Sequence, residues 1–278
     1  RALEKTWIVA EIGVNHEGSY DRAAEMIELA ASCGVDAVKF QTYKPENYVS
    51  REQLERFERV KRFQLSYEQF KKLAQVAEKN RVSFFSTPLY FDDADFLADF
   101  CTTIKISSGD LTFLELIKHV ASKNKNLIVS TGLGTREEVS AAVNAVQSTN
   151  PDLISSGQFA LMHCVAAYPP APHEPNLRNL IWLQQFGLPV GYSDHTLGIK
   201  ACELAVAAGA KIIEKHFTYR KEGQTFHDHH ISADPKEMRE LVENIRTAEV
   251  YLGSTERTRT ESELKMVSHM RRSLGAAI

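Results

Sequence analysis

The sequence lacks the features that mark membrane proteins and nucleic-acid-binding proteins. No apolar run approaches the roughly 18 residues that a membrane-spanning helix needs. There is no long basic run, and the formal net charge is −3 over 278 residues. Neither nucleic acid nor an anionic membrane is therefore expected as a main partner. No signal peptide is recognisable, and a cytoplasmic location is expected.

Cysteine is scarce, and its spacing excludes the common metal and redox motifs. The four cysteines lie in separate apolar segments and form no CxxC pair, at Cys33, Cys101, Cys164 and Cys202. This pattern is typical of reduced, buried thiols in a cytosolic protein. Cys164 ends an expected strand and could line a site, but no base with activating spacing accompanies it.

Glycine-rich nucleotide-binding loops are also missing. No GxGxxG follows the first expected strand, and no Walker-type loop occurs. These absences disfavour a doubly wound open sheet. Any phosphate would have to be held by side chains from several strands rather than by one loop.

What is present is a regular alternation of short buried strands and amphipathic helices. Eight apolar runs are expected to be strands, at 7–13, 37–42, 83–88, 103–108, 127–131, 159–164, 189–195 and 211–217. Segments with helical spacing lie between them, at 20–33, 67–80, 136–147 and 199–208. Eight parallel βαβ units in a chain of this length predict a single TIM (β/α)8 barrel covering 1–278, with no second domain.

Further segments surround this repeat. We expect residues 45–65 to form a helical excursion over the barrel mouth, and 166–175, with its four prolines, to form a stiff loop. Residues 235–252 are expected to be the eighth helix, and about 256–274 a terminal helix.

Two histidines are expected to meet at the mouth of the barrel. Ser193 and His195 end one strand, and Glu214 and His216 end the next. Residues two apart share a face of a strand, so both imidazoles would point into the mouth. Two neutral imidazoles can bind a divalent metal and leave its other positions open for water and substrate.

Cations and hydroxyl groups collect at the same strand ends. Together they match what a phosphate needs: Lys39, Lys105, Thr87, Ser108, Ser130 and Ser193. Charges inside a barrel are costly unless they are paired or bind a ligand. A ring that contains Glu11, Lys39, Lys105 and Glu214 is therefore difficult to explain by packing alone.

The acidic residues divide by position. Glu11 and Asp228 would reach the mouth and are candidates for acid–base or hydroxyl-binding roles. Glu214 would lie one layer deeper than His216, where partnering a lysine, orienting a ligand and acting in catalysis all remain open. Asp194 would point away, toward the helices, in a structural role. One of the loop histidines could supply a third metal ligand, from His227, His229 and His230.

The ordered set of motifs resembles the sialic acid synthase (N-acetylneuraminate synthase) family, which also includes relatives that make legionaminic acid, pseudaminic acid and spore-coat sugars. The matching stretches, in chain order, are AEIGVNH (10–16), KFQT (39–42), STP (86–88), KISSGD (105–110), STG (130–132), HC (163–164), YP (168–169), SDHT (193–196), EKHF (214–217) and DH (228–229). The ordered set is specific, above all SDHT followed by EKHF, whereas single triplets such as STG are weak.

The resemblance implies a TIM barrel, expected as a homodimer, that condenses phosphoenolpyruvate with an N-acylmannosamine-type sugar and uses one Mn²⁺ or Mg²⁺ ion. By matching motif, His195 and His216 resemble the metal ligands, and Glu11 resembles the catalytic carboxylate. The residues that resemble phosphoenolpyruvate contacts are Lys105, Ser108, Ser130, Ser193 and Thr87, with Lys39 and Tyr168 nearby. Gln41 and Asp228 resemble contacts to the acceptor sugar.

Three departures from the family pattern affect these expectations. Ala166 stands where family members usually carry a polar residue, often Asn, and the loop read GPDH in the family is here residues 226–229, FHDH. The C-terminal antifreeze-like domain of the family, which lends an Arg to the partner's active site, is not found within 1–278. We therefore expect a barrel-only member or one from which that domain was removed.

Other functions remain compatible with the residues alone. One is a metal-dependent aldolase or lyase that uses pyruvate without phosphoenolpyruvate. Another is a Schiff-base aldolase that uses Lys105 or Lys215 as the nucleophile. A third is a non-catalytic barrel that binds a sugar phosphate.

Overall fold

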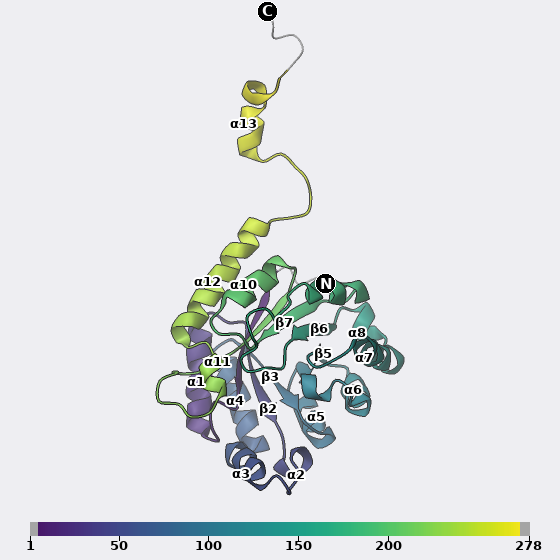
Figure 1. The fold of residues 1–278 in the computed structure, drawn as a ribbon, viewed down its shortest axis with the longest axis vertical. Helices are drawn as coiled ribbons and strands as arrows, with labels where there is room; N and C mark the ends of the chain where they lie inside the picture. The colour runs from purple at the N-terminus through teal and green to yellow at the C-terminus, as the bar shows by residue number, and fades with distance from the viewer. Residues whose placement is uncertain (1–4, 273–278) are drawn as a thin grey trace, which may run out of the picture.

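The computed structural model describes residues 5–272 and shows a closed, parallel eight-stranded barrel (Figure 1). The strands are β1 (Trp7–Gly13), β2 (Ala37–Thr42), β3 (Ser83–Pro88), β4 (Thr103–Ile106), β5 (Asn126–Ser130), β6 (Phe159–Cys164), β7 (Val190–Asp194) and β8 (Ile212–His216). Each strand pairs with the next in the chain, and β8 pairs with β1. The predicted TIM barrel is confirmed.

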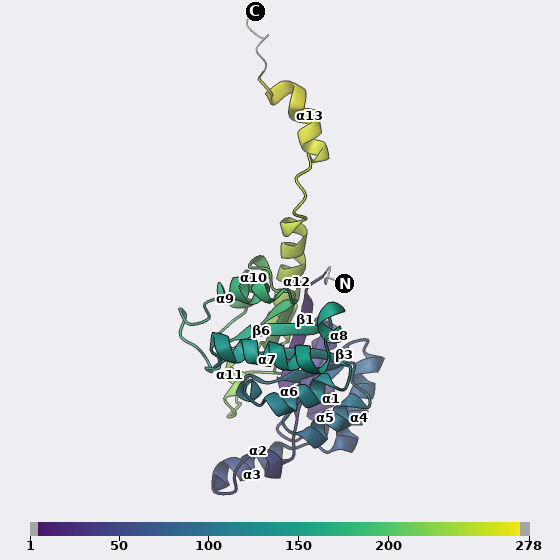
Figure 2. The same cartoon turned by 90° about the vertical axis from the view of Figure 1, so that its right-hand side faces the viewer.

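Most of the helices and short helical turns surround the barrel and connect its strands, whereas the last helix lies apart from the barrel toward the C-terminus (Figures 1 and 2). They are α1 (Tyr20–Ser32), α2 (Pro45–Tyr48), α3 (Leu54–Phe63), α4 (Tyr67–Lys79), α5 (Phe91–Ala98), η1 (Ser108–Asp110), α6 (Leu114–Ala121), α7 (Arg136–Thr149), α8 (Asp152–Ser155), α9 (Asn179–Leu183), η2 (Gln184–Phe186), α10 (Lys200–Ala207), α11 (Asp228–Ile231), α12 (Pro235–Leu252) and α13 (Glu261–Met270). None of these helices, within residues 5–272, is long and apolar enough to span a bilayer.

Local sequence fixes where several helices begin. Ser66 and Thr135 each accept a hydrogen bond from the third backbone N–H of the helix that follows, and the side chain of that third residue bonds back. These capping boxes satisfy N–H groups that the first turn of a helix leaves without partners.

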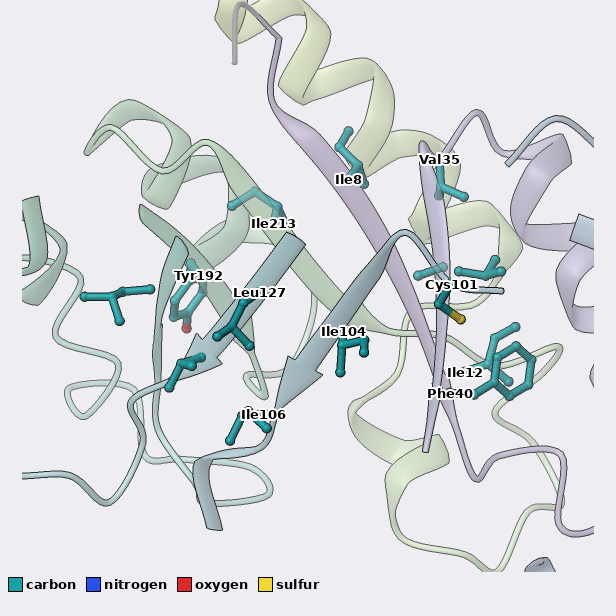
Figure 3. Close-up of a cluster of buried hydrophobic side chains, with 14 of the residues drawn as sticks. Ile8, Ile12, Val35, Phe40, Cys101, Ile104, Ile106, Leu127, Tyr192 and Ile213 are labelled. Carbon is teal, nitrogen blue, oxygen red and sulfur yellow. The ribbon is translucent and has the colours of Figure 1, made fainter. Parts of the chain in front are cut away.

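The core has two layers, because alternate strand residues face opposite sides of the barrel wall. Outward residues pack against the helices; Figure 3 shows this layer with Ile8, Phe40, Ile104, Tyr192 and Ile213 among the labelled side chains. Inward apolar residues fill the lower half of the barrel, namely Val9, Ala37, Phe85, Ile128, Ala160, Met162 and Ile212. The floor of the site is therefore a packed apolar plug.

The register of the strands places charged side chains above this plug. β1 pairs with β8 so that Val9 lies beside Glu214 and Glu11 lies beside His216. Glu214 is thus one layer deeper than His216, as strand alternation predicts. Both acids still sit at the carboxyl end of the barrel, where the connecting loops form a mouth.

Most expected elements match to within a residue or two, and two differences have a clear description. β4 ends at Ile106 instead of continuing to residue 108, because the chain turns into η1, where the Ser107 hydroxyl donates to Asp110 Oδ2 at 2.6 Å. The expected terminal helix begins at Glu261 and ends at Met270, and residues 273–274 lie outside the described part of the chain. All four cysteines are buried and unpaired.

Candidate active site

A cavity of about 350 Å³ opens at the carboxyl ends of the strands. It brings together all the expected site residues except Asp228, namely Glu11, Lys39, Gln41, Thr87, Lys105, Ser108, Ser130, Tyr168, Ser193, His195 and His216. Asp228 instead lines an adjoining cavity of about 280 Å³. The two cavities share walls, including Gln41, Tyr168 and His216, so together they form one site with two compartments.

Two imidazoles meet in the wall of the first compartment, as the strand geometry predicts, and His216 also lines the second. The ring centroids of His195 and His216 are 5.2 Å apart, and each residue is only 5% exposed. His195 Nδ1 donates to the Val165 carbonyl at 2.8 Å, which leaves Nε2 as the unprotonated nitrogen. His216 Nδ1 has no hydrogen-bond partner. Burial lowers the pKa of both rings, that of His216 to about 3, so both are neutral near pH 7.

Beside and below His216 lies a buried chain of four charges. Lys39 Nζ is 2.8 Å from Glu11 Oε1, and Lys105 Nζ is 2.6 Å from Glu214 Oε1. A longer contact of 3.8 Å joins Lys39 to Glu214, and the Ser193 hydroxyl donates to Glu214 at 2.9 Å. Glu214 is thus the partner of a lysine, which was one of its open alternatives.

The two acids differ in how strongly they hold a proton. Burial alone would raise the pKa of Glu214, but the ammonium groups of Lys105 and Lys39 outweigh burial and lower this pKa to about 2. At Glu11 burial outweighs the effect of Lys39, so the pKa of Glu11 is raised. Glu214 therefore stays ionised, and Glu11 is the acid that more readily takes up a proton.

Several buried polar atoms around the cavity lack protein partners. Within residues 5–272 these include Glu11 Oε2, Glu214 Oε2, the Ser130 hydroxyl and His216 Nδ1. Buried polar atoms are nearly always hydrogen-bonded, and each unpaired one costs free energy. All four belong to residues that line the cavity, where a bound polar ligand could supply the missing partners.

The position of Lys215 excludes one of the two lysines considered as a Schiff-base nucleophile. Lys215 points away from the mouth, where its Nζ bonds Asp194 Oδ2 at 2.8 Å and the Thr196 carbonyl at 2.6 Å. It does not line the cavity, so it cannot be the nucleophile of a Schiff-base aldolase.

Asp194 is structural, as strand alternation predicts. The structure does not bring a loop histidine together with His195 and His216: within residues 5–272 no group of three His, Cys, Asp or Glu is placed to hold an ion.

Sequence reasoning missed several residues of the cavity wall. Asp110 lines it because η1 turns the chain inward, and burial raises the pKa of this carboxyl. Tyr48 and Arg56 line both compartments from the excursion that contains α2 and α3. The signal for Asp110 was its place directly after a strand, whereas nothing in the periodicity of 45–65 indicated which side chains face the mouth.

Comparison with known proteins agrees with this arrangement. The sequence profile of the NeuB family matches residues 26–257. The N,N'-diacetyllegionaminic acid synthase of Legionella pneumophila is 38% identical over 283 residues, which cover 96% of this chain and 79% of that protein. The N-acetylneuraminate-9-phosphate synthase of Homo sapiens is 32% identical over 263 residues, covering 89% and 71%.

Solved structures show the same relationship. The crystal structure of N-acetylneuraminic acid synthetase from Leptospira borgpetersenii has a TM-score of 0.89 at 32% identity, covering 97% of this chain and 93% of that one. The spore coat polysaccharide biosynthesis protein SpsE of Bacillus subtilis has a TM-score of 0.78 at 32% identity, covering 94% and 76%. The resemblance drawn from the motifs is confirmed: the chain is an enzyme of the sugar-acid synthase type, and it belongs to the NeuB family.

Proposed function

We propose that the protein condenses phosphoenolpyruvate with an N-acylmannosamine-like amino sugar, or its 6-phosphate, and releases phosphate. The product would be a nine-carbon 2-keto-3-deoxy acid. One observation supports this most directly: two neutral imidazoles adjoin a cavity whose walls hold two buried lysines and several unpaired polar atoms.

Phosphoenolpyruvate would occupy the first compartment. It carries a carboxylate and a phosphate, and charge-assisted hydrogen bonds from lysine are among the stronger polar contacts. Lys39 and Lys105 supply the cations, and the hydroxyls come from Thr87, Ser108, Ser130 and Ser193. Ser108 Oγ already accepts from the Gly132 N–H at 3.1 Å, so its own proton is free for a ligand.

The residues also suit a divalent ion such as Mn²⁺ or Mg²⁺. His195 and His216 would hold it through neutral nitrogens, and the absence of a third protein ligand among residues 5–272 leaves positions for water and substrate. The ion would act as a Lewis acid on the sugar aldehyde. The unpartnered Nδ1 of His216 is the observation in this structure that favours such a ligand.

The chain's own residues would orient the two substrates and move protons. Gln41 and Asp228 would hold the sugar so that its aldehyde carbon faces C3 of phosphoenolpyruvate. C3 forms the new carbon–carbon bond, water adds at C2, and the bond from C2 to the phosphate oxygen breaks. Glu11, with its raised pKa, would transfer a proton, and the lysines would balance negative charge as the intermediate forms.

Incubation with phosphoenolpyruvate, Mn²⁺ and a panel of hexosamines tests this proposal. The expected result is phosphate release, with a product whose mass is the sum of acceptor and pyruvate. In ¹⁸O water the label should enter the sugar acid and not the phosphate, because the C–O bond breaks. No phosphate release with any acceptor would contradict the proposal.

The same assay distinguishes the alternatives. A metal-dependent pyruvate aldolase or lyase would form or cleave the product with pyruvate and release no phosphate. A Schiff-base aldolase would leave pyruvate attached to Lys105 after borohydride treatment. The contact of 2.6 Å to Glu214 argues against that route, since it holds the Lys105 nitrogen in an ion pair and not as a free amine. A non-catalytic barrel would bind ligands without turnover.

A further inference from the structure

The expected acceptor contact Asp228 lies on a very short element. It opens α11, a helix of four residues within the long connection between β8 and α12. A helix this short is not stable by itself in water. Contacts from elsewhere must therefore fix the position of the Asp228 carboxylate.

The side chain of the next residue, His229, points the other way and is 1% exposed. Its Nε2 is 3.1 Å from Glu17 Oε1, in the turn between β1 and α1. Its Nδ1 is 2.7 Å from the hydroxyl of Thr218, just after β8. The Glu17 carboxylate oxygen accepts from Nε2–H. Nδ1 contacts the Thr218 hydroxyl, which also donates to the backbone carbonyl of Arg220 at 2.8 Å. The imidazole therefore connects two loops and has no nitrogen left for a metal.

A second anchor reaches the same short helix from the same turn. Asn15 Nδ2 donates to the Ser232 hydroxyl at 2.9 Å and to the Phe217 carbonyl at 2.8 Å. That Ser232 hydroxyl in turn donates to the backbone carbonyl of Asp228 at 2.6 Å. The turn after β1 therefore contacts α11 through His229 and also contacts Ser232, the residue that follows this helix.

These contacts fix the position of α11 and so determine which groups the Asp228 carboxylate can reach. Oδ1 is 3.0 Å from His227 Nε2, and Oδ2 is 3.8 Å from Nδ1 of His216. Asp228 also lines the compartment beside Gln41. Without the anchors α11 would be free to shift, and the carboxylate would leave this place.

We propose that His229 is a positioning residue of the acceptor compartment, whose contacts with Glu17 and Thr218 hold Asp228 toward the sugar. This inference rests on the proposed function for its kinetic readout, but not for its structural one. It also gives the DH pair at 228–229 two separate tasks: the acid faces the ligand, and the histidine faces the scaffold.

The test replaces the partners of His229 and leaves the ring in place. Glu17→Ala removes the contact at Nε2. Thr218→Val removes the contact at Nδ1 together with the bonds of that hydroxyl to the Arg220 backbone. Glu17→Gln keeps an acceptor oxygen, and Thr218→Ser keeps the hydroxyl. Glu28→Ala, on the exposed side of α1, is the matched control. For each protein KM is measured separately for the acceptor and for phosphoenolpyruvate, and backbone amide exchange is followed over residues 227–232.

We expect Glu17→Ala and Thr218→Val to raise acceptor KM about tenfold, equivalent to about 1.4 kcal/mol, while KM for phosphoenolpyruvate stays within about twofold. The conservative variants and the control should behave like the parent. Amide exchange should accelerate at 227–232 and not in the barrel strands.

Three results would overturn the inference. The first is an unchanged acceptor KM in both disruptive variants. The second is a parallel rise in both KM values with a lower melting temperature, which indicates a general structural role. The third is unchanged amide exchange at 227–232. If the parent itself shows no turnover, the proposed function fails, and the exchange measurement still decides whether the anchor exists.

Discussion

Glu214 offers a test of the buried charges on which the site depends. It accepts hydrogen bonds from Lys105 and Ser193 and lies 3.8 Å from Lys39, and it is 3% exposed. Glu214→Gln keeps the volume but leaves the two lysines with one carboxylate, Glu11, between them. Removing one partner of a buried pair typically costs about 3–5 kcal/mol.

The pKa of Glu214 gives a similar magnitude. Its fall from 4.5 to about 2 corresponds to roughly 3 kcal/mol of differential interaction. A lowered pKa means that the unfolded chain binds the proton more tightly. The stabilisation is therefore fully present above about pH 4.5 and is lost as the pH falls toward 2. The variant and the parent should differ most at neutral pH and converge in acid.

Chemical denaturation between pH 7 and pH 3 measures this effect. We expect Glu214→Gln to lower the free energy of unfolding by about 3 kcal/mol at pH 7, with a smaller difference at pH 3. Inorganic phosphate or phosphoenolpyruvate should recover part of the loss, because an anion can replace the missing charge. Glu115→Gln is the control: it breaks an exposed pair with Lys118 worth less than about 1 kcal/mol. A Glu214→Gln protein whose free energy of unfolding stays within about 1 kcal/mol of the parent at pH 7 would show that this carboxylate does not stabilise the buried lysines.

Two further predictions concern packing and pH. A Cβ at Gly191 would lie 2.8 Å from both the Cβ and the carbonyl oxygen of Ile212, so Gly191→Ala should lower unfolding free energy by about 1–3 kcal/mol. Gly109→Ala, whose Cβ would meet nothing closer than 3.8 Å, should change it little in the same denaturation experiment, and equal losses would contradict this view. Burial raises the pKa of Asp93 to about 6. The protonated side chain therefore stabilises the fold at low pH, and this contribution is lost as the pH rises through 6. Asp93→Asn should therefore lose less stability than the parent between pH 5 and pH 8, and parallel pH profiles would contradict the assignment.

Much of the fold could be predicted because the barrel repeats a simple pattern. Apolar runs bounded by polar strand ends gave β1 and β2 with their observed bounds. Strand alternation placed Glu214 below His216 and turned Asp194 outward, since a two-residue period leaves only two choices of face. The convergence of His195 and His216 followed from the same rule applied to neighbouring strands.

The orientations of the other site residues depend on loops, whose side chains follow no periodic pattern. Asp110 enters the cavity through η1, and Arg56 enters from α3, and neither orientation is encoded in strand alternation. His229 looked as available for a metal as His227, because sequence does not show which of two adjacent side chains faces the scaffold. Lys105 and Lys215 were likewise equal candidates until the structure placed them on opposite sides of the barrel wall.

The proposed function requires that His195 and His216 together hold one divalent ion beside a cavity for phosphoenolpyruvate. Calorimetric titration of Mn²⁺ into the parent, His195→Ala and His216→Ala tests it most directly, with phosphoenolpyruvate titrated separately into metal-free protein. We expect one Mn²⁺ site in the parent, no detectable site in either variant, and phosphoenolpyruvate binding in all three. Mn²⁺ binding of parental strength in either histidine variant would contradict it.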